Sequence, residues 1–268
     1  MIAPLLAFTY GKITTEGDTM KVIAIANQKG GVGKTTTAAT LTAGLTDRGY
    51  KVLAIDTDSQ VNLTASMGAT AQQTVLGVLT GELSADAAIT HTPTGDLIPG
   101  SNRLANADML LDETGKEYKL REAIEPLHSQ YDFIVIDTPP SLNILTINAL
   151  TAADYVIVPA QADLYSLQGI SELAKTIDAV RKYCNPGLKV SGILLTMYNG
   201  RTRIAKEVTE ILEQLAKRLD TRVFTTKIRS SVKATEIQFK QGGLFKYAPK
   251  ATVTEDYRAW INEILALI

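Results

Sequence analysis

Cysteine is almost absent from this chain, because Cys184 is the only one among 268 residues. A single thiol excludes a disulfide framework within the chain, and it excludes a metal or iron–sulfur site built only from cysteines of one chain. A shortage of cysteine is typical of proteins that work in a reducing cytoplasm. We therefore expect a cytoplasmic protein.

Long hydrophobic runs are also missing. The apolar runs extend over 5 to 8 residues, whereas a helix that spans a bilayer needs about 20. Residues 1–19 contain one apolar patch, APLLAF, but no charged segment precedes it and no clear cleavage site follows it, so we predict no signal peptide. Because Met20 directly precedes the first strand-like run, we interpret residues 1–19 as an N-terminal extension or as the product of an upstream start codon, and residues 20–268 as a single domain.

The chain as a whole has no large excess of either charge. It contains 27 Lys and Arg and 28 Asp and Glu, which give a net charge of −1. This balance hides an asymmetry: residues 181–250 contain 15 basic and 5 acidic residues, whereas the remainder contains 12 and 23. Such a split favours an anionic partner for the C-terminal third of the chain. The alternative interpretation is a set of ordinary solvated helix faces.

What the chain does contain is an alternation of short apolar runs and helical stretches. The spacing of apolar residues predicts helices over Lys34–Arg48 and Ile204–Leu219. Five runs rich in Val and Ile barely alternate, as expected of strands buried on both faces of a mainly parallel sheet. We predict an α/β fold, a doubly wound and mainly parallel sheet with helices on both faces. Residues 68–130 are least readable, and we expect helices and loops there. The predicted strands are Val22–Ala26, Val52–Ile55, Phe133–Ile136, Tyr155–Val158 and Val190–Leu195.

The stretch QKGGVGKTTT, residues 28–37, follows the first predicted strand. A strict P-loop has glycine where this chain has Gln28, but Gly33, Lys34 and Thr35 stand where a helix opens after a buried strand. Glycines let backbone amides turn toward one phosphate site, and the helix N-terminus adds free N–H groups. Lys34 would reach the β- and γ-phosphates, and the Thr35 hydroxyl would bind Mg²⁺. A mere glycine-rich turn does not explain Lys-Thr-Thr. The predicted contacts with ATP or ADP are Gly30, Gly31, Val32, Gly33, Lys34, Thr35 and Thr36.

Carboxylates follow two other predicted strands. Asp137 ends the buried run of YDFIVIDTPPS, which is the usual place of a Walker B acid that binds Mg²⁺. Asp56 and Asp58 end another strand, and alternation places them on the same side of an extended chain. An acid at this position can orient a water for attack on the γ-phosphate. We predict Thr35 and Asp137 at the metal; a surface turn with solvated charges is the less favoured alternative for Asp56 and Asp58.

These motifs together resemble the ParA/MinD group of deviant Walker A ATPases. KGGVGKTT, IDTDSQ and DFIVIDTPPS carry the resemblance, and LTINALTAADYVIVPAQADLYSLQGISEL and GILLTMYNGRTR are most similar to the ParA (Soj) branch, which partitions plasmids and chromosomes. The similarity extends from about Lys21 to the C-terminus and is weak over residues 68–130. It implies a Mg²⁺-dependent, P-loop ATPase domain over residues 20–268 and an ATP-bound homodimer.

The resemblance also assigns roles to single residues. Lys29 matches the family's second lysine, which reaches across the dimer to the partner subunit's nucleotide, much as an arginine finger does. Asp58 matches the acid that positions the attacking water, Asp56 supports the site, and Asp137 is the Walker B acid. The catalytic residues implied are therefore Lys29, Lys34 and Asp58.

Two loops depart from the family pattern. The positions that contact adenine in the family fall on Arg229 and Ser231, in KIRSSVKATEIQ, and the family often has Pro where this chain has Arg229. The loop after Asp58 usually has Pro and Gly where this chain has Ser59 and Val61. The second departure lies outside the predicted phosphate chemistry.

The resemblance gives the basic segment a function. ParA dimers bind duplex DNA without sequence preference, and phosphate contacts of this kind provide affinity without sequence reading. Arg201 matches a family arginine implicated in that binding, and Lys233 matches a second one. Arg203 lies beside Arg201, and further basic residues can join them. The implied partners are non-specific DNA, which would make the ATP-bound form nucleoid-associated, and a ParB-type centromere-binding protein.

Two other classes of ATPase remain as alternatives. A MinD-like membrane-cycling ATPase that positions a cellular cargo should end in a basic amphipathic helix, but this chain has no Lys or Arg after Arg258. A metal-cluster or sorting ATPase would need paired cysteines. We therefore expect DNA partitioning and no membrane partner, with the MinD-like function as the alternative.

Overall fold

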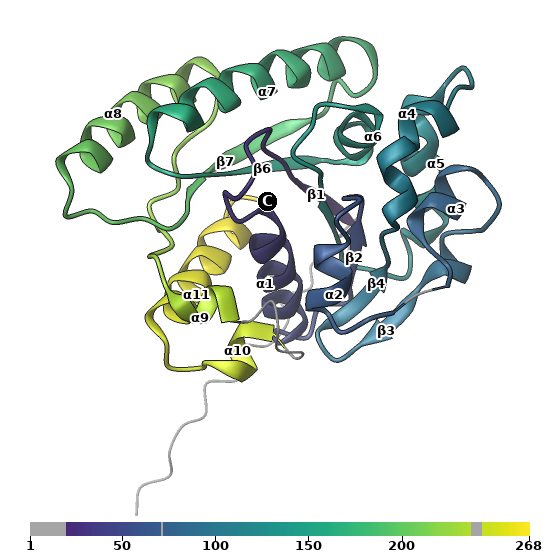
Figure 1. The fold of residues 1–268 in the computed structure, drawn as a ribbon, viewed down its shortest axis with the longest axis horizontal. Helices are drawn as coiled ribbons and strands as arrows, with labels where there is room; N and C mark the ends of the chain where they lie inside the picture. Colours follow the sequence, from purple (N-terminus) through teal and green to yellow (C-terminus); the bar gives the residue numbers. More distant parts are fainter. Residues whose placement is uncertain (1–19, 71, 237–242) are drawn as a thin grey trace, which may run out of the picture.

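The computed structural model describes residues 20–70, 72–236 and 243–268 (Figure 1). The predicted extension, residues 1–19, lies outside the described residues. One sheet has the strand order β3-β4-β2-β5-β1-β6-β7, and every neighbouring pair is parallel except β3 with β4. The predicted mainly parallel α/β sheet is therefore confirmed. The strands are β1 Lys21–Ile25, β2 Val52–Asp56, β3 Thr90–Thr92, β4 Gly95–Ile98, β5 Phe133–Asp137, β6 Tyr155–Ala160 and β7 Lys189–Leu195.

Two of these strands correct the expectation for residues 68–130, where helices and loops alone were expected. β3 is a short edge strand of sequence THT whose side chains are half-buried or exposed, so no apolar run marks it. β4 begins with Gly95 and Asp96, which interrupt its apolar pattern. The five strands predicted from apolar runs are all present.

Helices cover both faces of the sheet (Figure 1). Alternate residues of β1 explain this: Ile23 belongs to one hydrophobic core with α1, α10 and α11, whereas Val22 belongs to a second core with α3, α5, α6, α7 and α8. The predicted helices over 34–48 and 204–219 correspond to α1 and α8. The helices are α1 Lys34–Thr46, α2 Asn62–Ser66, α3 Val75–Leu79, α4 Ala107–Leu110, α5 Lys119–Ile124, α6 Ile144–Ala152, α7 Leu164–Tyr183, α8 Arg203–Arg218, α9 Val232–Glu236, α10 Gly243–Tyr247 and α11 Thr252–Leu265, with short 3-10 turns at Asp86–Ala88, Asn102–Asn106, Lys116–Tyr118 and Glu125–Leu127.

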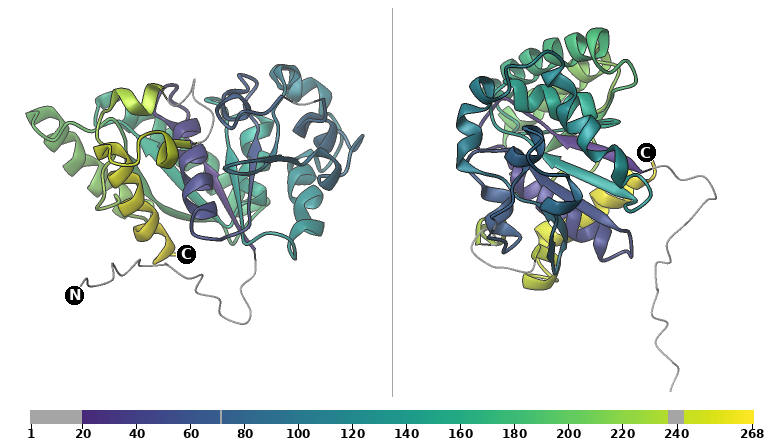
Figure 2. Two further views of the ribbon diagram at one scale, coloured as in Figure 1. Left: turned by 90° about the horizontal axis from the view of Figure 1, so that it is seen from below. Right: turned by 90° about the vertical axis from the view of Figure 1, so that its right-hand side faces the viewer.

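The last helix, α11, lies against α1, on the same side of the molecule (Figure 2). Tyr257, Trp260 and Ile261 are almost completely buried there, and the ring of Trp260 meets the ring of Phe224 edge-on at 5.9 Å between centroids. The apolar face of α11 is thus occupied by the core. Within residues 20–70, 72–236 and 243–268, no helix combines the length and the apolar character that crossing a membrane requires.

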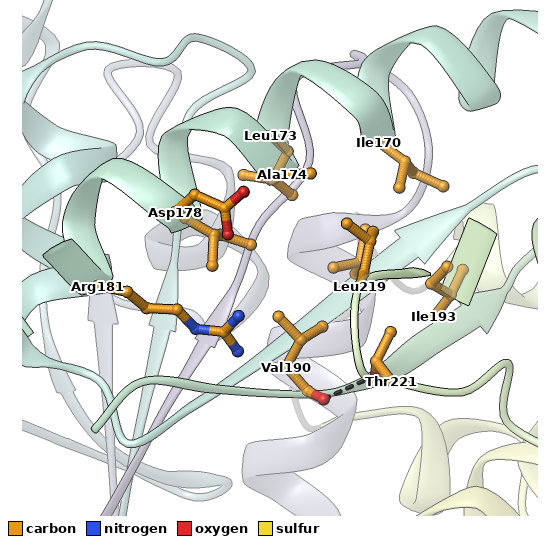
Figure 3. Close-up of a pocket in the computed structure, with 11 residues that line it drawn as sticks. Ile170, Leu173, Ala174, Asp178, Arg181, Val190, Ile193, Leu219 and Thr221 are labelled. Atoms are coloured by element: carbon orange, nitrogen blue, oxygen red, sulfur yellow. Dashed lines mark hydrogen bonds between the residues drawn. The ribbon is translucent and has the colours of Figure 1, made fainter. Parts of the chain in front are cut away.

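A narrow cavity lies between α7 and β7 (Figure 3). It has a volume of only about 10 Å³, enough for about one water molecule. Two of its polar side chains bind within the chain: Arg181 Nε donates to the carbonyl of Leu188 at 2.8 Å, and Thr221 Oγ1 donates to the carbonyl of Val190 at 2.7 Å. The cavity therefore belongs to the packing of α7 on the sheet.

The parallel strands bring distant parts of the chain to one edge of the sheet. Ile25 at the end of β1 pairs with Asp137 at the end of β5, and Asp137 also pairs with Asp56 at the end of β2. In open α/β sheets, ligands bind beyond the carboxyl ends of the strands. The loops that leave these strands contain the predicted site residues.

Candidate active site

The glycine-rich loop connects β1 to α1. Gly31 and Gly33 have φ angles of 72° and 84°, a left-handed conformation that glycine adopts without strain. A residue just past β7 holds the loop, because Thr196 Oγ1 donates to the carbonyl of Val32 at 2.8 Å. Asn27 Nδ2 donates to the carbonyl of Pro159 at 2.6 Å. Neighbouring strands therefore fix the loop, and a side chain built at Gly30 or Gly31 would meet no atom within 4 Å, so the loop's outer side is open.

Lys34, the first residue of α1, is buried behind this loop. Its Nζ donates to the carbonyl of Lys29 at 3.2 Å. Burial lowers the pKa of Lys34, while the charges of Asp137 and Asp58 act in the opposite direction. The ammonium thus lies between the loop backbone and two carboxylates. This is the position from which a lysine can serve phosphates bound over the loop.

Asp137 is fully buried, and neither of its carboxylate oxygens makes a hydrogen bond with any described residue. Burial raises the pKa of Asp137 well above its usual range, and the nearby charge of Asp56 adds to this effect. The Thr35 hydroxyl, which lies near the carboxylate without the geometry of a full hydrogen bond, and the charge of Lys34 oppose it. A buried carboxylate without a full set of partners is costly. Its environment is therefore suited to a cation that is added with a ligand.

Asp56 has the opposite arrangement. Its Oδ2 accepts hydrogen bonds from the Thr64 amide at 2.9 Å and from Thr64 Oγ1 at 2.7 Å, and its Oδ1 accepts one from the Asp58 amide at 3.2 Å. Thr64 Oγ1 in turn accepts from the amide of Gly100 at 2.9 Å. Burial raises the pKa of Asp56 to about 6 in spite of these bonds. Asp56 therefore holds α2 and the Asp58 loop to the sheet.

Asp58 is buried and sits in a tight turn after β2. Its Oδ1 accepts from the Gln60 amide at 3.0 Å, and its carbonyl accepts from the Val61 amide at 3.0 Å. The charge of Asp58 also acts on nearby Lys34. The turn requires a φ of 58° at Val61, where the resembling family usually has glycine. The loop beside Asp58 is thus strained, because β-branched residues rarely adopt that conformation.

The residues present fit a magnesium–nucleotide complex. Asp137 supplies an unsatisfied buried carboxylate, Thr35 a hydroxyl beside it, and Lys34 a cation under the open loop. Across the part of the chain that the structure describes, no three His, Cys, Asp or Glu residues form a complete metal cage. Mg²⁺ is usually bound by one or two protein groups together with phosphate oxygens and water, so this small donor set is sufficient. Thr36 lies next along α1, half-buried beside Thr35.

The ammonium group of Lys29 has partners different from those of the Lys34 ammonium. Its ammonium group is ion-paired with Asp163 and also donates to Gln161 Oε1 at 3.3 Å. Both partners follow β6, in the loop that leads into α7. The spacing of Lys29 within the glycine-rich stretch gave no signal for these partners, because they lie more than 130 positions further along the chain.

The predicted adenine contacts lie in the segment before α9. Arg229 is exposed, and its guanidinium is bonded to both carboxylate oxygens of Asp256, at 2.6 to 3.1 Å, while its amide also donates to Asp256 at 3.0 Å. The side chain thus connects this segment to α11. Ser231 is half-buried, and its Oγ accepts from the amide of Lys233 at 3.2 Å.

The predicted DNA-binding residues are exposed and lie on neighbouring segments. The Tyr198 amide donates to the carbonyl of Ile228 at 2.8 Å, which holds the loop containing Arg201 beside the segment that leads to Lys233. Arg203, at the start of α8, pairs with Glu207 at 2.7 Å, and Lys233 pairs with Glu236 at 2.8 Å. Exposed pairs of this kind are weak, so these cations remain available to phosphate groups.

Comparisons with known proteins agree with this geometry. Residues 20–190 match the family described as AAA domain. The chain is 38% identical over 252 residues to the sporulation initiation inhibitor protein Soj of Bacillus subtilis. The aligned region covers 92% of this chain and 98% of that protein. It is 40% identical over 247 residues to the chromosome-partitioning ATPase Soj of Thermus thermophilus, over 92% of this chain and 96% of that one.

Solved structures are similar as well. One is described as cobyrinic acid a,c-diamide synthase from Mycobacterium smegmatis with bound ADP and magnesium; it has a TM-score of 0.79 and 37% identity, over 92% of this chain and 94% of that chain. A putative plasmid partition protein from Borrelia burgdorferi bound to AMPPNP has a TM-score of 0.77 and 26% identity, over 92% and 98%. Both share the fold and are nucleotide complexes.

Proposed function

The chain belongs to the ParA/Soj family of partition ATPases, and we propose on that basis that it hydrolyses ATP with Mg²⁺ to move plasmid or chromosomal DNA. The observation that supports this most strongly is the difference between two neighbouring acids. Asp56 is hydrogen-bonded three times within the chain, whereas buried Asp137 keeps both oxygens unbonded among the described residues. A protein that held no cation beside Asp137 would gain stability by replacing it.

Each residue has a defined task in the proposed reaction. Bound Mg²⁺ would neutralise charge on the phosphates, with Asp137 and the Thr35 hydroxyl as its protein partners. Lys34 would exchange its bond to the Lys29 carbonyl for the β- and γ-phosphates, and amides of residues 30–36 would bind further phosphate oxygens. Asp58 would orient a water molecule through its carboxylate. The Asp56–Thr64 bonds would keep Asp58 in place.

ATP binding is proposed to assemble a homodimer, in which Lys29 of each subunit contacts the nucleotide of the other. The dimer would bring two basic surfaces together, each with Arg201, Arg203 and Lys233, and bind duplex DNA without sequence preference. Residues 181–250 supply the charge for this, with 15 basic against 5 acidic residues. A ParB-type partner would stimulate hydrolysis and release the DNA, so that the protein alternates between a nucleoid-associated and a free cytoplasmic form.

The MinD-like alternative receives less support. The apolar residues of α11 are buried against α1 and are not available to a membrane surface. One similar structure is described as a synthase, an activity other than partitioning. The relatives named for partitioning match this chain at 38 and 40% identity over 92% of its length, which favours partitioning.

The test is phosphate release by the full chain with ATP and Mg²⁺, alone, with duplex DNA, and with DNA plus the ParB-type protein of the same replicon. We expect slow release alone and faster release with DNA and partner together. Lys34→Ala should abolish release, whereas Lys51→Ala, which removes an exposed lysine just before β2 at the opposite edge of the sheet, should not. Release that ignores Lys34, or that never responds to DNA and partner, would contradict the proposal.

A further inference from the structure

Lys29 is held by the start of α7, the helix that follows the β6 loop. Its ammonium contacts the carboxylate of Asp163, donates to Gln161 Oε1 at 3.3 Å and lies 5.9 Å from the centre of the Tyr165 ring. The side chains of Lys29 and Asp163 are only 23% and 35% exposed. The pair is therefore partly shielded from water and stronger than an ordinary surface pair.

Asp163 is itself fixed in position. It is the N-cap of α7, and its Oδ1 accepts from the Ser166 amide at 2.9 Å while Oδ2 faces Lys29. Burial acts to raise the pKa of Asp163, but the hydrogen bonds from Lys29 and Ser166 outweigh it and the pKa is lowered. Asp163 is thus a charged and oriented partner for Lys29.

The backbones on the two sides of the pair are also in close contact. The Lys29 amide donates to Asn27 Oδ1 at 2.9 Å. A side chain built at Gly169, in the second turn of α7, would meet Asn27 Oδ1 at 3.2 Å and the Lys29 amide at 3.7 Å. α7 therefore lies directly against the base of the glycine-rich loop, and glycine at 169 permits this approach.

The outer side of the pair is open. Leu164 and Tyr165, the first two residues of α7, are 67% and 78% exposed. Because these neighbours face solvent, release of Lys29 from Asp163 would require no change in the core.

We propose that Asp163 is a positioning residue that retains Lys29 within its own subunit, so that ATP-dependent dimerisation must first break the Lys29–Asp163 pair. This inference rests on the proposed function, because it takes the partner subunit's nucleotide as the second destination of Lys29. A phosphate group and Asp163 are both anions, and one ammonium group cannot be fully paired with both when they lie in different subunits. Asp163 would therefore set the protein concentration at which dimers form.

The first experiment needs no nucleotide. The full chain is treated briefly with an amine-reactive acylating reagent, and the modification of Lys29 is measured by peptide mass spectrometry. In Asp163→Asn the N-cap is retained, because Asn caps helices as well as Asp, but the charge is lost. We expect Lys29 to react several-fold faster than in the wild type, while other lysines in the digest are unchanged. An equal rate in both proteins would overturn the proposal.

The second experiment measures dimerisation by sedimentation at increasing protein concentration, with saturating ATP and Mg²⁺ and in an Asp58→Ala background. We expect Asp163→Asn to dimerise at a concentration about 3- to 10-fold lower than its parent. Asp178→Asn, which removes an exposed charge from the same helix, should leave both the midpoint and the Lys29 labelling rate unchanged. An unchanged or raised midpoint for Asp163→Asn overturns the proposal.

The two experiments separate the possible failures. If no ATP-dependent dimer forms in any variant, the proposed function fails, and with it the idea that Asp163 and the partner subunit's nucleotide compete for Lys29. The labelling rates still decide whether Asp163 holds Lys29. If dimers form but Asp163→Asn behaves like Asp178→Asn, only the positioning role fails. Adding Lys29→Ala to Asp163→Asn should abolish the gain in dimerisation, because the gain depends on the released lysine.

Discussion

Asp56 and Asp137 lie directly opposite each other at the ends of β2 and β5, but their surroundings differ. Asp56 accepts three hydrogen bonds from Thr64 and the Asp58 amide, while Asp137 makes none with the described residues. Two carboxylates this close cannot both be charged at low cost when buried. The nucleotide-free protein thus carries an electrostatic strain that an added cation would relieve.

Neutralising Asp137 should therefore stabilise the nucleotide-free protein. Burial raises the pKa of both acids, that of Asp56 to about 6. A folded-state pKa above the unfolded value means that stability is greatest at low pH and is lost as pH rises through the folded pKa. We expect Asp137→Asn to raise the free energy of unfolding at pH 7.5 by about 1–3 kcal/mol. Thermal melts between pH 4.5 and 8 check this.

The same variant should lose Mg²⁺-dependent protection by ATP in these melts. Asp58 still faces Lys34 in Asp137→Asn, so the buried lysine keeps one charged neighbour. A lower melting temperature than the wild type at pH 7.5 would show that Asp137 is a structural partner of Lys34 instead.

Removing the Asp58 carboxylate should separate binding from hydrolysis. Asp58→Ala leaves Lys34, Thr35 and Asp137 in place, so we expect ATP and Mg²⁺ to bind normally while hydrolysis falls by at least about 100-fold. The ATP-bound dimer should then persist in light scattering. Phosphate release at the wild-type rate would show that another residue orients the attacking water.

Lys29→Ala should bind ATP as a monomer. Lys34 and the loop amides remain, so calorimetry should give an affinity close to that of the wild type. Dimers should not form on ATP, because the cation supplied to the partner subunit's nucleotide is lost. An ATP-dependent dimer of this variant in sedimentation would exclude the role of Lys29 across the interface.

Val61→Gly should stabilise the loop that contains Asp58. Val61 has a φ of 58°, a conformation that costs an L-residue about 1–2 kcal/mol and that glycine adopts freely. Because glycine also increases the entropy of the unfolded chain, we expect a net gain of about 0.5–1 kcal/mol. The melting temperature should rise by about 1–4 °C. A decrease would mean that the packing of the valine side chain outweighs the strain.

DNA binding should depend on nucleotide and on salt, but not on sequence. We expect the ATP-bound dimer of Asp58→Ala to bind any duplex more tightly than the ADP form, with log affinity falling by about 0.9 per phosphate contact for each unit of log salt. Arg201→Ala or Lys233→Ala should weaken all duplexes alike and reduce this slope by about two units per dimer, with ATP binding unchanged. Affinities that ignore both residues would remove the DNA role from this surface.

The sequence by itself determined the positions of the main strands and of the loop between β1 and α1. This was possible because the relevant signals are local: buried parallel strands form continuous apolar runs, and the glycines of residues 30–33 adjoin Lys34 and Thr35. It also located Asp56 and Asp137 at strand ends. β3 escaped prediction because a short polar edge strand has no apolar run, and β4 because Gly95 and Asp96 interrupt its apolar pattern.

Only the tertiary structure decided what each of these side chains contacts. Strand pairing brings Asp56 opposite Asp137. Thr64 donates hydrogen bonds to Asp56 but not to Asp137, whose carboxylate has no hydrogen bond with the described residues. The sheet likewise sets Lys29 beside Asp163, 134 positions further along the chain. Partners at such separations are chosen by the packing of β6 and α7 against the loop, and no periodicity in the sequence records them.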